Sequence, residues 1–465
     1  MIKLQSLITE YDDSLSGDSY IDPLGQLVIW SAFGQKIFNS RVNSVSNDVR
    51  NFTLNLLHHG VIRSILQDES VTVSPALAAA VGDKESLPFI HACLIYLENI
   101  FTYSMVDKPE EVDIDTLGIL GGSNGRRAME ESDQNPSLLF TDKKEGHLLV
   151  RQLGLGVSGR YKTPFVEMGF FDHSYRYSHQ KSEEKWGAFN TLLDNHSELR
   201  DCFEQAKAHI IDLLNVHYSK AQIPPRRQFR DVPVALRDAY RNAFSTQGKV
   251  GVETKAFWLD VTGLNKGAAG ALLVTLEDHY AAATGEKLVP RIIFVTAEER
   301  CEVADERRKL QLIQIVEPLL AELDLLFRLA RHKKVQSVRD VRGYWESLGR
   351  TDQTLRDAAA RIWAAGDLLP TLQGTARRRL QKLLDVAVNG NVEDQLQGLL
   401  KYHAQIMKTR GQLRWLEATP GGEIRLYGRT EPLPKTDNRA NGSWANTYYI
   451  YQFYNLVSGY QGGAR

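Results

Sequence analysis

Residues 249–296 constrain the fold of this chain more than any other stretch, because they combine strand signals, a glycine loop and helix formers. Val250–Val261 is rich in β-branched and aromatic residues, which favour a strand covered by other elements. A glycine-containing loop follows, then a helical apolar pattern, and then the short apolar run Arg291–Val295. This order predicts a βαβ element with two parallel strands and a right-handed crossover.

The glycine loop of this element, GLNKGAAG at 263–270, has two interpretations. Backbone amides at a helix N-terminus bind phosphate, and Lys266 would add a positive charge there. The spacing fits neither the P-loop nor GxGxxG, because no Lys-Ser/Thr pair follows the last glycine. The favoured interpretation is that the small residues let the helix pack closely on its neighbour.

Glu253-Thr254-Lys255, followed by an apolar run, resembles the E-x-K half-motif of the PD-(D/E)xK nuclease superfamily. The resemblance implies that Glu253 helps to hold a divalent metal such as Mg²⁺, while Lys255 positions water or stabilises developing charge. On a strand, residues two apart point to the same side, as this chemistry needs. The alternative is an ordinary surface pair.

The resemblance lacks the acid that this superfamily carries on a preceding strand. The nearest candidates are Asp231 and Asp238, in a segment with a helical pattern. The resemblance therefore covers three residues and a local topology, about one tenth of the chain. Outside this nuclease alternative, the sequence predicts no cofactor and no metal site.

The rest of the chain reads as helical. Helical periods cover 27–38, 49–66 and 87–103, and a long amphipathic helix is expected over 297–331, with Thr296 as N-cap and a kink or break at Pro318. Adjacent histidines, His58 and His59, are expected to be one solvated and one packed, since neighbours do not share a helix face.

The C-terminal region differs from the helical body. Residues 413–428 form a hairpin by their Pro-Gly-Gly turn and alternation. A helix that ends in a hairpin gives the outline of a winged helix. The aromatic tail at 447–461 is too apolar for a solvated tail and should dock on the body or on another subunit.

The fold class expected is therefore α-rich and multi-domain, α+β overall, with helical bundles flanking one small α/β element. Four parts are predicted: an acidic helical domain at 1–106, a helical middle region at 107–230, the α/β element at 231–296, and a helical domain with hairpin and tail at 297–465. Polar, proline-bearing linkers are expected at 107–115 and 224–230.

Charge is distributed unevenly along the chain. The net charge is −1, yet residues 1–140 carry 9 Lys and Arg against 19 Asp and Glu, and residues 141–465 carry 47 against 38. This asymmetry suggests separate partners or contact between the two parts. The three cysteines are widely spaced, and no apolar run approaches the roughly 20 residues that span a bilayer. The start of the chain has no signal-peptide pattern, so a cytoplasmic protein without membrane contact is expected.

Local clusters of cations are the candidate contacts to nucleic acid. The first cluster is Arg160 with Lys162, on a glycine turn between two short helices, where Pro164 would be the first residue of the second helix. The second is Arg226, Arg227 and Arg230, in a proline-stiffened connector. The third is Arg377, Arg378 and Arg379, of which at least one should face protein. Capping of carbonyls and pairing with acids are the alternatives for each cluster.

Three functions follow from these observations. The first is a non-catalytic subunit of a bacterial multiprotein assembly acting on nucleic acid, in genome maintenance or anti-phage defence, with other protein subunits and DNA as partners. The second is a metal-dependent nuclease at Glu253 and Lys255. The third is a protein–protein scaffold with no affinity for nucleic acid, which a binding assay at low salt would separate from the first.

Overall fold

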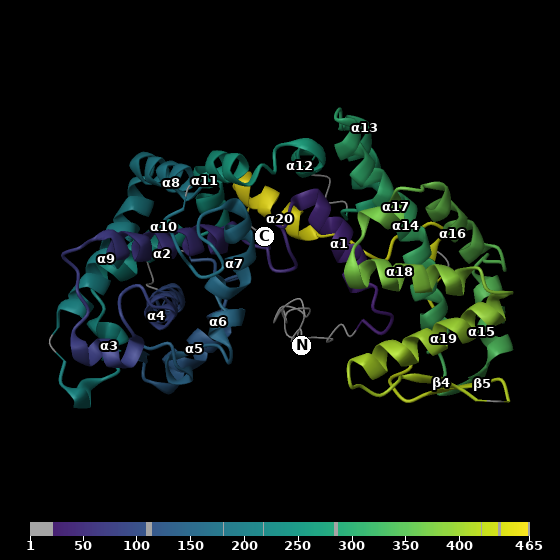
Figure 1. Cartoon of the computed structure of the whole chain (residues 1–465), viewed down its shortest axis with the longest axis horizontal. Coiled ribbons are helices and arrows are strands. Elements are labelled where there is room, and N and C mark those ends of the chain that lie inside the picture. The colour runs from purple at the N-terminus through teal and green to yellow at the C-terminus, as the bar shows by residue number, and fades with distance from the viewer. Residues whose placement is uncertain are drawn as a thin grey trace. The chain divides into compact units, whose positions relative to one another are not determined.

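The computed structural model describes residues 22–107, 114–179, 181–216, 218–282, 287–419, 421–435 and 439–463. The protein is α-rich, with two small antiparallel sheets, which confirms the expected α+β multi-domain class (Figure 1). The described residues form two compact units. Unit 1 contains 39–265 and the residues after 450, and unit 2 contains the residues up to Phe38 together with 266–450.

Unit 1 holds most of the first half of the chain. Its elements are α2 (Val49–Gln67), α3 (Pro75–Val81), α4 (Leu87–Val106), α5 (Gly122–Glu131), β1 (Ser137–Leu139), η3 (Lys144–Gly146), α6 (Gln152–Leu155), α7 (Val157–Met168), α8 (Ser182–Asn195), α9 (Ser197–Asn215), η4 (Lys220–Gln222), β2 (Arg226–Gln228), η5 (Phe229–Asp231), α10 (Val234–Phe244), α11 (Gln247–Thr262) and most of α20 (Ile450–Tyr460). The expected helices at 49–66 and 87–103 are confirmed as α2 and α4.

The core of unit 1 is built around α2, which contacts α4, α7, α9 and α11. Because neighbours surround it, both histidines of α2 are buried, and the expectation that one is solvated is wrong. His58 Nε2 lies 2.9 Å from the Tyr240 hydroxyl, and His59 Nδ1 lies 2.7 Å from the Tyr177 hydroxyl. Burial lowers the pKa of His58 to about 3 and that of His59 well below its usual value.

Helix α4 is the second central element of unit 1. Among the described helices, it is the one long and apolar enough to cross a membrane, yet 89% of its most apolar window is buried inside the protein. That burial is typical of a core helix.

The stretch that predicted a βαβ element is helical throughout, so that prediction is wrong. Val250–Val261 lies in α11, whose N-terminus is capped by Thr246 Oγ1, which accepts a hydrogen bond from the Lys249 amide at 3.1 Å. Its buried side chains include Val250, Thr254 and Trp258, a spacing of four that suits a helix as well as the β-branched content suits a strand. The cap and the core contacts decide between the two.

The second expected strand, Arg291–Val295, is also helical. It lies in α13 (Pro290–Arg300), which begins with a proline at its first position, as helices favour. The chain passes from unit 1 to unit 2 between Asn265 and Lys266, inside the stretch expected to form one element.

Unit 2 contains the remaining elements. They are α1 (Leu27–Phe38), α12 (Gly267–Ala281), α13, α14 (Ala304–Leu329), β3 (Val335–Ser337), α15 (Val338–Ser347), α16 (Thr354–Ala364), α17 (Leu368–Thr371), α18 (Gly374–Ala387), α19 (Val392–Thr409), β4 (Leu416–Ala418) and β5 (Glu423–Leu426). The expected helix at 27–38 is confirmed as α1. Helix α14 is the core of unit 2, since it contacts α1, α12, α13, α15, α16 and α19.

The single helix expected over 297–331 is two helices. Thr296 lies inside α13 and is not an N-cap. Helix α13 ends at Arg300, and α14 begins at Ala304. Pro318 lies within α14, which continues through it. A proline disfavours the helical conformation of the residue before it, but the helix can continue when packing on many sides holds it.

The C-terminal hairpin is confirmed. Strands β4 and β5 pair antiparallel, with Leu416 opposite Leu426, and β3 pairs with the other edge of β5. The sheet order is therefore β3-β5-β4, with α15 directly after β3 and α19 before β4. This connectivity resembles the expected winged-helix outline, with α16, α17 and α18 between its helices.

The aromatic tail docks on the body, as expected. In unit 2, the buried Glu317 carboxylate accepts hydrogen bonds from the Asn446 amide at 2.8 Å and from the Tyr448 hydroxyl at 2.6 Å. In unit 1, α20 lies against α11 at small residues, because the positions for a Cβ on Gly251 and on Gly248 are filled by the backbone of Gly459 and Gly462.

Candidate functional site

Glu253 and Lys255 do not form the arrangement that the nuclease motif requires. Both lie on α11, where residues two apart are separated by about 200° around the helix axis, so the two side chains leave different faces. Glu253 is half-buried near Glu198 and Lys249. Burial and the negative charge of Glu198 raise the pKa of Glu253. Lys249 forms an ion pair with Glu198, and its positive charge partly offsets the negative charges of Glu198 and Glu253.

The two candidate upstream acids have other partners. Asp231 is exposed and caps the short helix η5 by accepting a hydrogen bond from the Gln228 amide at 3.0 Å. Asp238 accepts a hydrogen bond from Arg241 Nη1 at 2.9 Å. The described residues contain no group of three or more His, Cys, Asp or Glu side chains placed to hold a metal ion.

Lys266 immediately precedes α12, where a phosphate would meet the helix N-terminus. Glu306 already occupies that position, because its Oε2 accepts a hydrogen bond from the Ala268 amide at 3.1 Å. A Cβ on Gly267, whose φ is +58°, would lie 2.8 Å from the Glu306 side chain. The glycine therefore allows an internal carboxylate to reach the helix N-terminus, which agrees with the packing interpretation of the loop.

Arg160 is buried, with 4% of its surface exposed, and cannot reach a phosphate on the surface. It lies near the buried Glu98, whose Oε1 accepts a hydrogen bond from the Val157 amide at 3.0 Å. Burial raises the pKa of Glu98 to about 7, although the amide and Arg160 partly oppose this. The expected glycine turn therefore brings a buried carboxylate to the start of α7.

Lys162, two residues further along α7, lies over the Tyr175 ring, 4.0 Å from its centre. Burial lowers the pKa of Lys162, and Asp172 partly opposes this. A cation held on an aromatic face serves local packing. Pro164 lies inside α7, not at its first position as expected.

The connector that carries Arg226, Arg227 and Arg230 is part of a small sheet. β2 pairs with β1, so that Arg227 lies opposite Leu138. Arg226 and Arg230 are exposed, whereas Arg227 is half-buried beside Tyr218, and its charge opposes the burial that raises the pKa of that hydroxyl. Two of the three arginines therefore face solvent.

Arg377, Arg378 and Arg379 lie in the first turns of α18. Arg379 faces protein, as expected of at least one of them, and donates a hydrogen bond to the Gly25 carbonyl at 3.0 Å. Arg377 and Arg378 are exposed. Their surroundings include three exposed lysines that the sequence did not single out: Lys382 on α18, and Lys401 and Lys408 on α19.

The two helices that carry these residues lie side by side. Lys382 Nζ donates a hydrogen bond to Gln405 Oε1 on α19 at 2.9 Å, and Val386 of α18 packs against Gly398 of α19. We define the basic face as the five exposed cations on these helices: Arg377, Arg378, Lys382, Lys401 and Lys408. Residues 374–410 hold seven Lys and Arg against three Asp and Glu.

Ion pairing separates the basic face from most other arginines of unit 2. Arg342 lies 2.8 Å from Glu346, Arg308 lies 2.6 Å from Asp367, and Arg328 lies 2.9 Å from Asp324. Within the described residues, none of the five cations of the basic face forms an ion pair with a carboxylate. A group of adjacent, exposed cations without counter-charges attracts anions.

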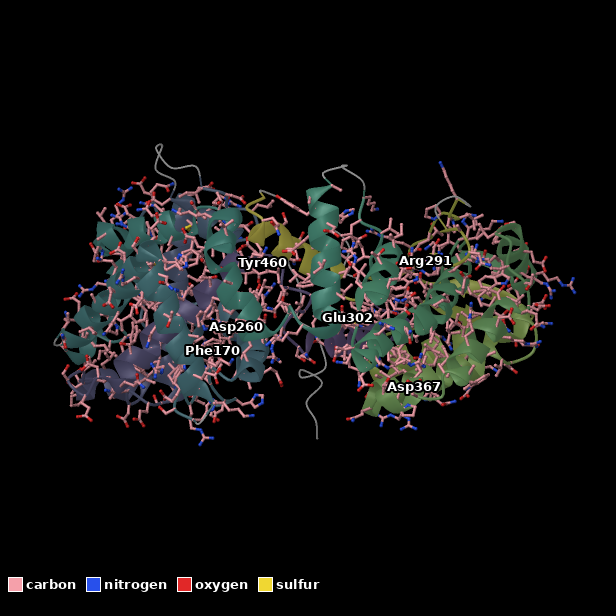
Figure 2. All side chains as sticks on the ribbon, turned by 90° about the horizontal axis from the view of Figure 1, so that it is seen from above. Phe170, Asp260, Arg291, Glu302, Asp367 and Tyr460 are labelled. Carbon is pink, nitrogen blue, oxygen red and sulfur yellow. The ribbon has the colours of Figure 1, made fainter. Side chains whose placement is uncertain are left out.

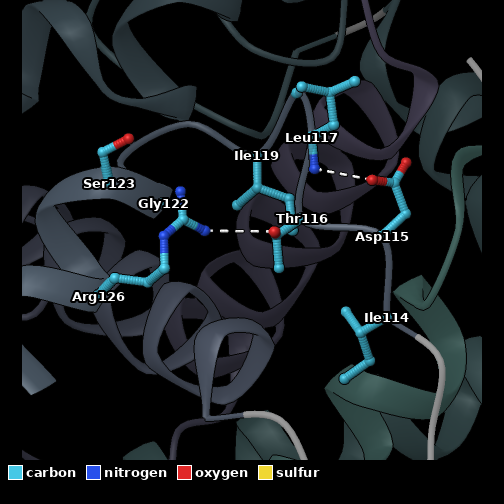
Figure 3. A pocket seen from close by; sticks show the side chains of 9 residues that line it. Ile114, Asp115, Thr116, Leu117, Ile119, Gly122, Ser123 and Arg126 are labelled. Atoms are coloured by element: carbon cyan, nitrogen blue, oxygen red, sulfur yellow. Dashed lines mark hydrogen bonds between the residues drawn. The ribbon is translucent and has the colours of Figure 1, made fainter.

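One cavity in unit 1 begins at the end of the linker expected at 107–115. It has a volume of about 510 Å³ and is lined by residues 114–119, Gly122, Ser123 and Arg126 (Figure 3). Arg126 Nη1 donates a hydrogen bond to Thr116 Oγ1 at 3.2 Å, and the Leu117 amide donates to Asp115 Oδ1 at 2.8 Å. Arg126 therefore already has a partner in the lining.

Comparison with known proteins adds no identification: no family model, no curated protein and no solved structure matches the chain.

Proposed function

We propose that this chain is a non-catalytic subunit of a bacterial assembly that acts on nucleic acid, and that it contacts phosphates through the basic face of α18 and α19. The observation that supports this proposal is that, among the described residues, five neighbouring exposed cations form no ion pair, whereas more than half of the other arginines of unit 2 do. Phosphate oxygens would supply the missing counter-charges.

The surroundings of the basic face also support it. α19 precedes the β4–β5 hairpin, as a recognition helix precedes its wing, and its exposed second half carries Lys401, Gln405 and Lys408. Side chains of these types bind phosphates and base edges. The acids Glu393 and Asp394 lie in the first turn of α19, so contact would be confined to its later turns.

A role as one subunit among several is supported by an exposed apolar stripe on another part of unit 2. Val289, which caps α13, and Ile292 and Val295 within it recur every three residues, and Ile292 is 60% exposed. Apolar stripes of this kind mark contacts between proteins. The assembly would work in the cytoplasm, in genome maintenance or anti-phage defence, with DNA as the expected nucleic acid.

The proposal is tested by measuring binding of labelled duplex DNA at several salt concentrations. The triple variant R377A/R378A/K382A should weaken binding to all sequences and should flatten the slope of log K against log salt by about two to three, since each phosphate contact contributes about 0.9. A matched control removes three exposed lysines of unit 1, Lys144, Lys181 and Lys220. It should leave the slope unchanged.

Two results would contradict the proposal. In the first, the protein and its assembly bind neither duplex nor single strands at low salt, which would leave a protein–protein scaffold. In the second, the slope is unchanged in the triple variant and falls when Arg226 and Arg230 are replaced, which would move the contact to the β1–β2 ribbon of unit 1.

A further inference from the structure

The first described residues of the chain contact both helices of the basic face. Arg379 of α18 donates a hydrogen bond to the Gly25 carbonyl at 3.0 Å, and Arg410, the residue after α19, donates one to Asp22 Oδ2 at 3.3 Å. Each of these two arginines is within two residues of a cation of the basic face. The chain therefore enters unit 2 beside that face.

This entry point is fixed within the packed unit. The buried Asp22 carboxylate accepts hydrogen bonds from the Gln26 amide at 2.8 Å and from the Leu27 amide at 3.0 Å, at the start of α1. The Pro23 carbonyl lies 2.9 Å from Nδ1 of His403 on α19. Residues that precede Asp22 therefore start from a defined position at the ends of α18 and α19.

The sequence just before the entry point is acidic. Residues 10–18, EYDDSLSGD, contain four Asp and Glu and no Lys or Arg. They precede the described part of the chain, and we call them the acidic segment. The basic face carries five positive charges, so the acidic segment and the basic face attract each other.

The acidic segment is close enough along the chain to reach the whole basic face. Asp18 is four residues before Asp22, and Asp13 is nine residues before it. An extended chain spans at most 3.6 Å per residue, so these two acids can lie as far as about 14 Å and about 32 Å from the entry point. Lys401 and Lys408, seven residues apart on α19, are separated by about 10 Å along the helix.

The described acids that flank the basic face in the sequence have other partners. They are Asp367, Asp385, Glu393 and Asp394. Asp367, labelled in Figure 2, lies 2.6 Å from Arg308, and Asp385 Oδ1 accepts a hydrogen bond from Gln381 at 3.3 Å. Glu393 lies 3.9 Å from Arg342, and Asp394 accepts a hydrogen bond from the Asn391 amide at 3.1 Å. None of these four forms an ion pair with the basic face, which leaves its cations open to another anion.

We propose that the acidic segment binds the basic face of its own chain and competes there with phosphate, as an intramolecular inhibitor of nucleic-acid binding. This inference rests on the proposed function and names the regulation of its site. Two observations carry it: the opposite charges of segment and face, and the entry of the chain beside that face. Tethering raises the local concentration of the carboxylates, whose oxygens bind Lys and Arg as phosphate oxygens do. Exposed ion pairs are weak, so nucleic acid can displace the segment.

The first experiment measures the affinity of the full-length variant E10Q/D12N/D13N for labelled duplex DNA at several salt concentrations. Removal of three charges from the competitor should raise the affinity about 3- to 10-fold at low salt, as expected when a few exposed ion pairs no longer oppose binding. The difference from the wild type should shrink as salt is added. The matched control, E130Q/E131Q/D133N, removes three exposed acids at the end of α5 in unit 1 and makes the same change in net charge. It should leave the affinity unchanged.

The second experiment locates the acidic segment without nucleic acid. A carbodiimide joins a carboxylate to a lysine amine in direct contact, and mass spectrometry of the peptides identifies the link. In the full-length protein, the acids of the segment should link to the lysines of the basic face, and these links should be lost at 1 M salt. A mixture of isotope-labelled and unlabelled protein separates links within one chain from links between chains. The variant K382R/K401R/K408R keeps the charges and removes the amines, so it should lose the links and retain the affinity of the wild type for DNA.

The two experiments distinguish failure of this inference from failure of the proposed function. If the wild type binds DNA, no link to the basic face forms and E10Q/D12N/D13N binds as its control does, the inhibition is wrong and the proposed function stands. Links to exposed lysines of unit 1 (Lys144, Lys181 and Lys220) in place of the basic face, or links between chains alone, would also overturn the inference. If the links form but neither the wild type nor E10Q/D12N/D13N binds nucleic acid, the segment binds the face, while the proposed function fails and the inhibitory role fails with it.

Discussion

Replacement of Gly251 by alanine tests the way in which the C-terminal helix is held in unit 1. Gly251 lies in the second turn of α11, and a Cβ built there would lie 2.2 Å from the Gly459 carbonyl oxygen and 2.4 Å from its carbon. Ordinary van der Waals contact begins near 3.4 Å. The two helices would therefore have to separate by about 1 Å, and because the obstacle is backbone, no change of rotamer can relieve the contact.

The expected cost follows from two opposing effects. Overpacking costs about 1–3 kcal/mol, and a contact with rigid backbone places this substitution at the upper end of that range. Alanine gains about 1 kcal/mol over glycine in a helix interior. The net destabilisation expected for Gly251→Ala is therefore about 2 kcal/mol. Gly248→Ala should cost less, since its Cβ would lie 2.6 Å from the Gly462 oxygen and nearer the helix start.

Gly187, on the outer face of α8 in the same unit, provides the control. A Cβ there would meet no atom within 4 Å, so Gly187→Ala should stabilise unit 1 by about 0.4–1 kcal/mol. The assay is urea unfolding followed by tryptophan fluorescence, to which Trp258 contributes; it lies two turns after Gly251 and is fully buried. A difference below about 0.5 kcal/mol between G251A and G187A would refute the close contact of α11 and α20.

Two further predictions concern pH and proteolysis. Burial lowers the pKa of His58 to about 3 in the folded protein, so below pH 6.5 the unfolded state binds more protons and stability is lost as the pH falls. Between pH 8 and pH 5, the free energy of unfolding of the wild type should fall by about 2 kcal/mol more than that of H58Q, measured by urea unfolding at each pH. An equal loss in both proteins would mean that His58 does not titrate in this way. Limited proteolysis should cut first near 107–115, which lies mostly outside the described residues, and near 224–230. Cuts concentrated within α14 would contradict the predicted division of the chain.

The sequence predicted the elements whose local and tertiary preferences agree. The helices at 27–38, 49–66 and 87–103 were placed to within a few residues, because their apolar periods coincide with real buried faces. The hairpin followed from its turn chemistry, and docking of the tail followed from its apolar content. In each case one local signal was sufficient, since no other interpretation competed with it.

The failures occurred where two local interpretations fit equally well. Val250–Val261 satisfies a strand by composition and a helix by spacing, and only the Thr246 cap and the surrounding helices select the helix. Arg160 looked like a surface cation because its sequence neighbours are glycine and tyrosine, and the buried carboxylate that receives it, Glu98, is 62 residues away along the chain. Pairing over such separations is not visible in a local pattern.

The same limitation hid most of the candidate interface. Lys401 and Lys408 are seven residues apart and therefore lie on one face of α19, a signal that was available in the sequence. Their importance depends on α18 lying beside them and on the lack of ion pairs to them among the described residues, which only the packed structure shows. Unpaired charge in three dimensions thus selects a candidate surface that arginine runs along the chain do not reveal.

A stability measurement can separate a binding role of these cations from a structural one. Arg377, Arg378 and Lys382 lie on adjacent turns of α18 without carboxylate partners in the described residues, so they repel one another. Their replacement by alanine should therefore raise the free energy of unfolding of unit 2 at low salt, by a few tenths of a kcal/mol for each cation removed. The increase should be smaller at 1 M salt, because the screening length there is about 3 Å. A structural role predicts the opposite sign, because lost contacts would destabilise the unit. A fall in stability of 1 kcal/mol or more at both salt concentrations would show that the basic face holds the fold together, and the argument for an anionic ligand would lose its basis.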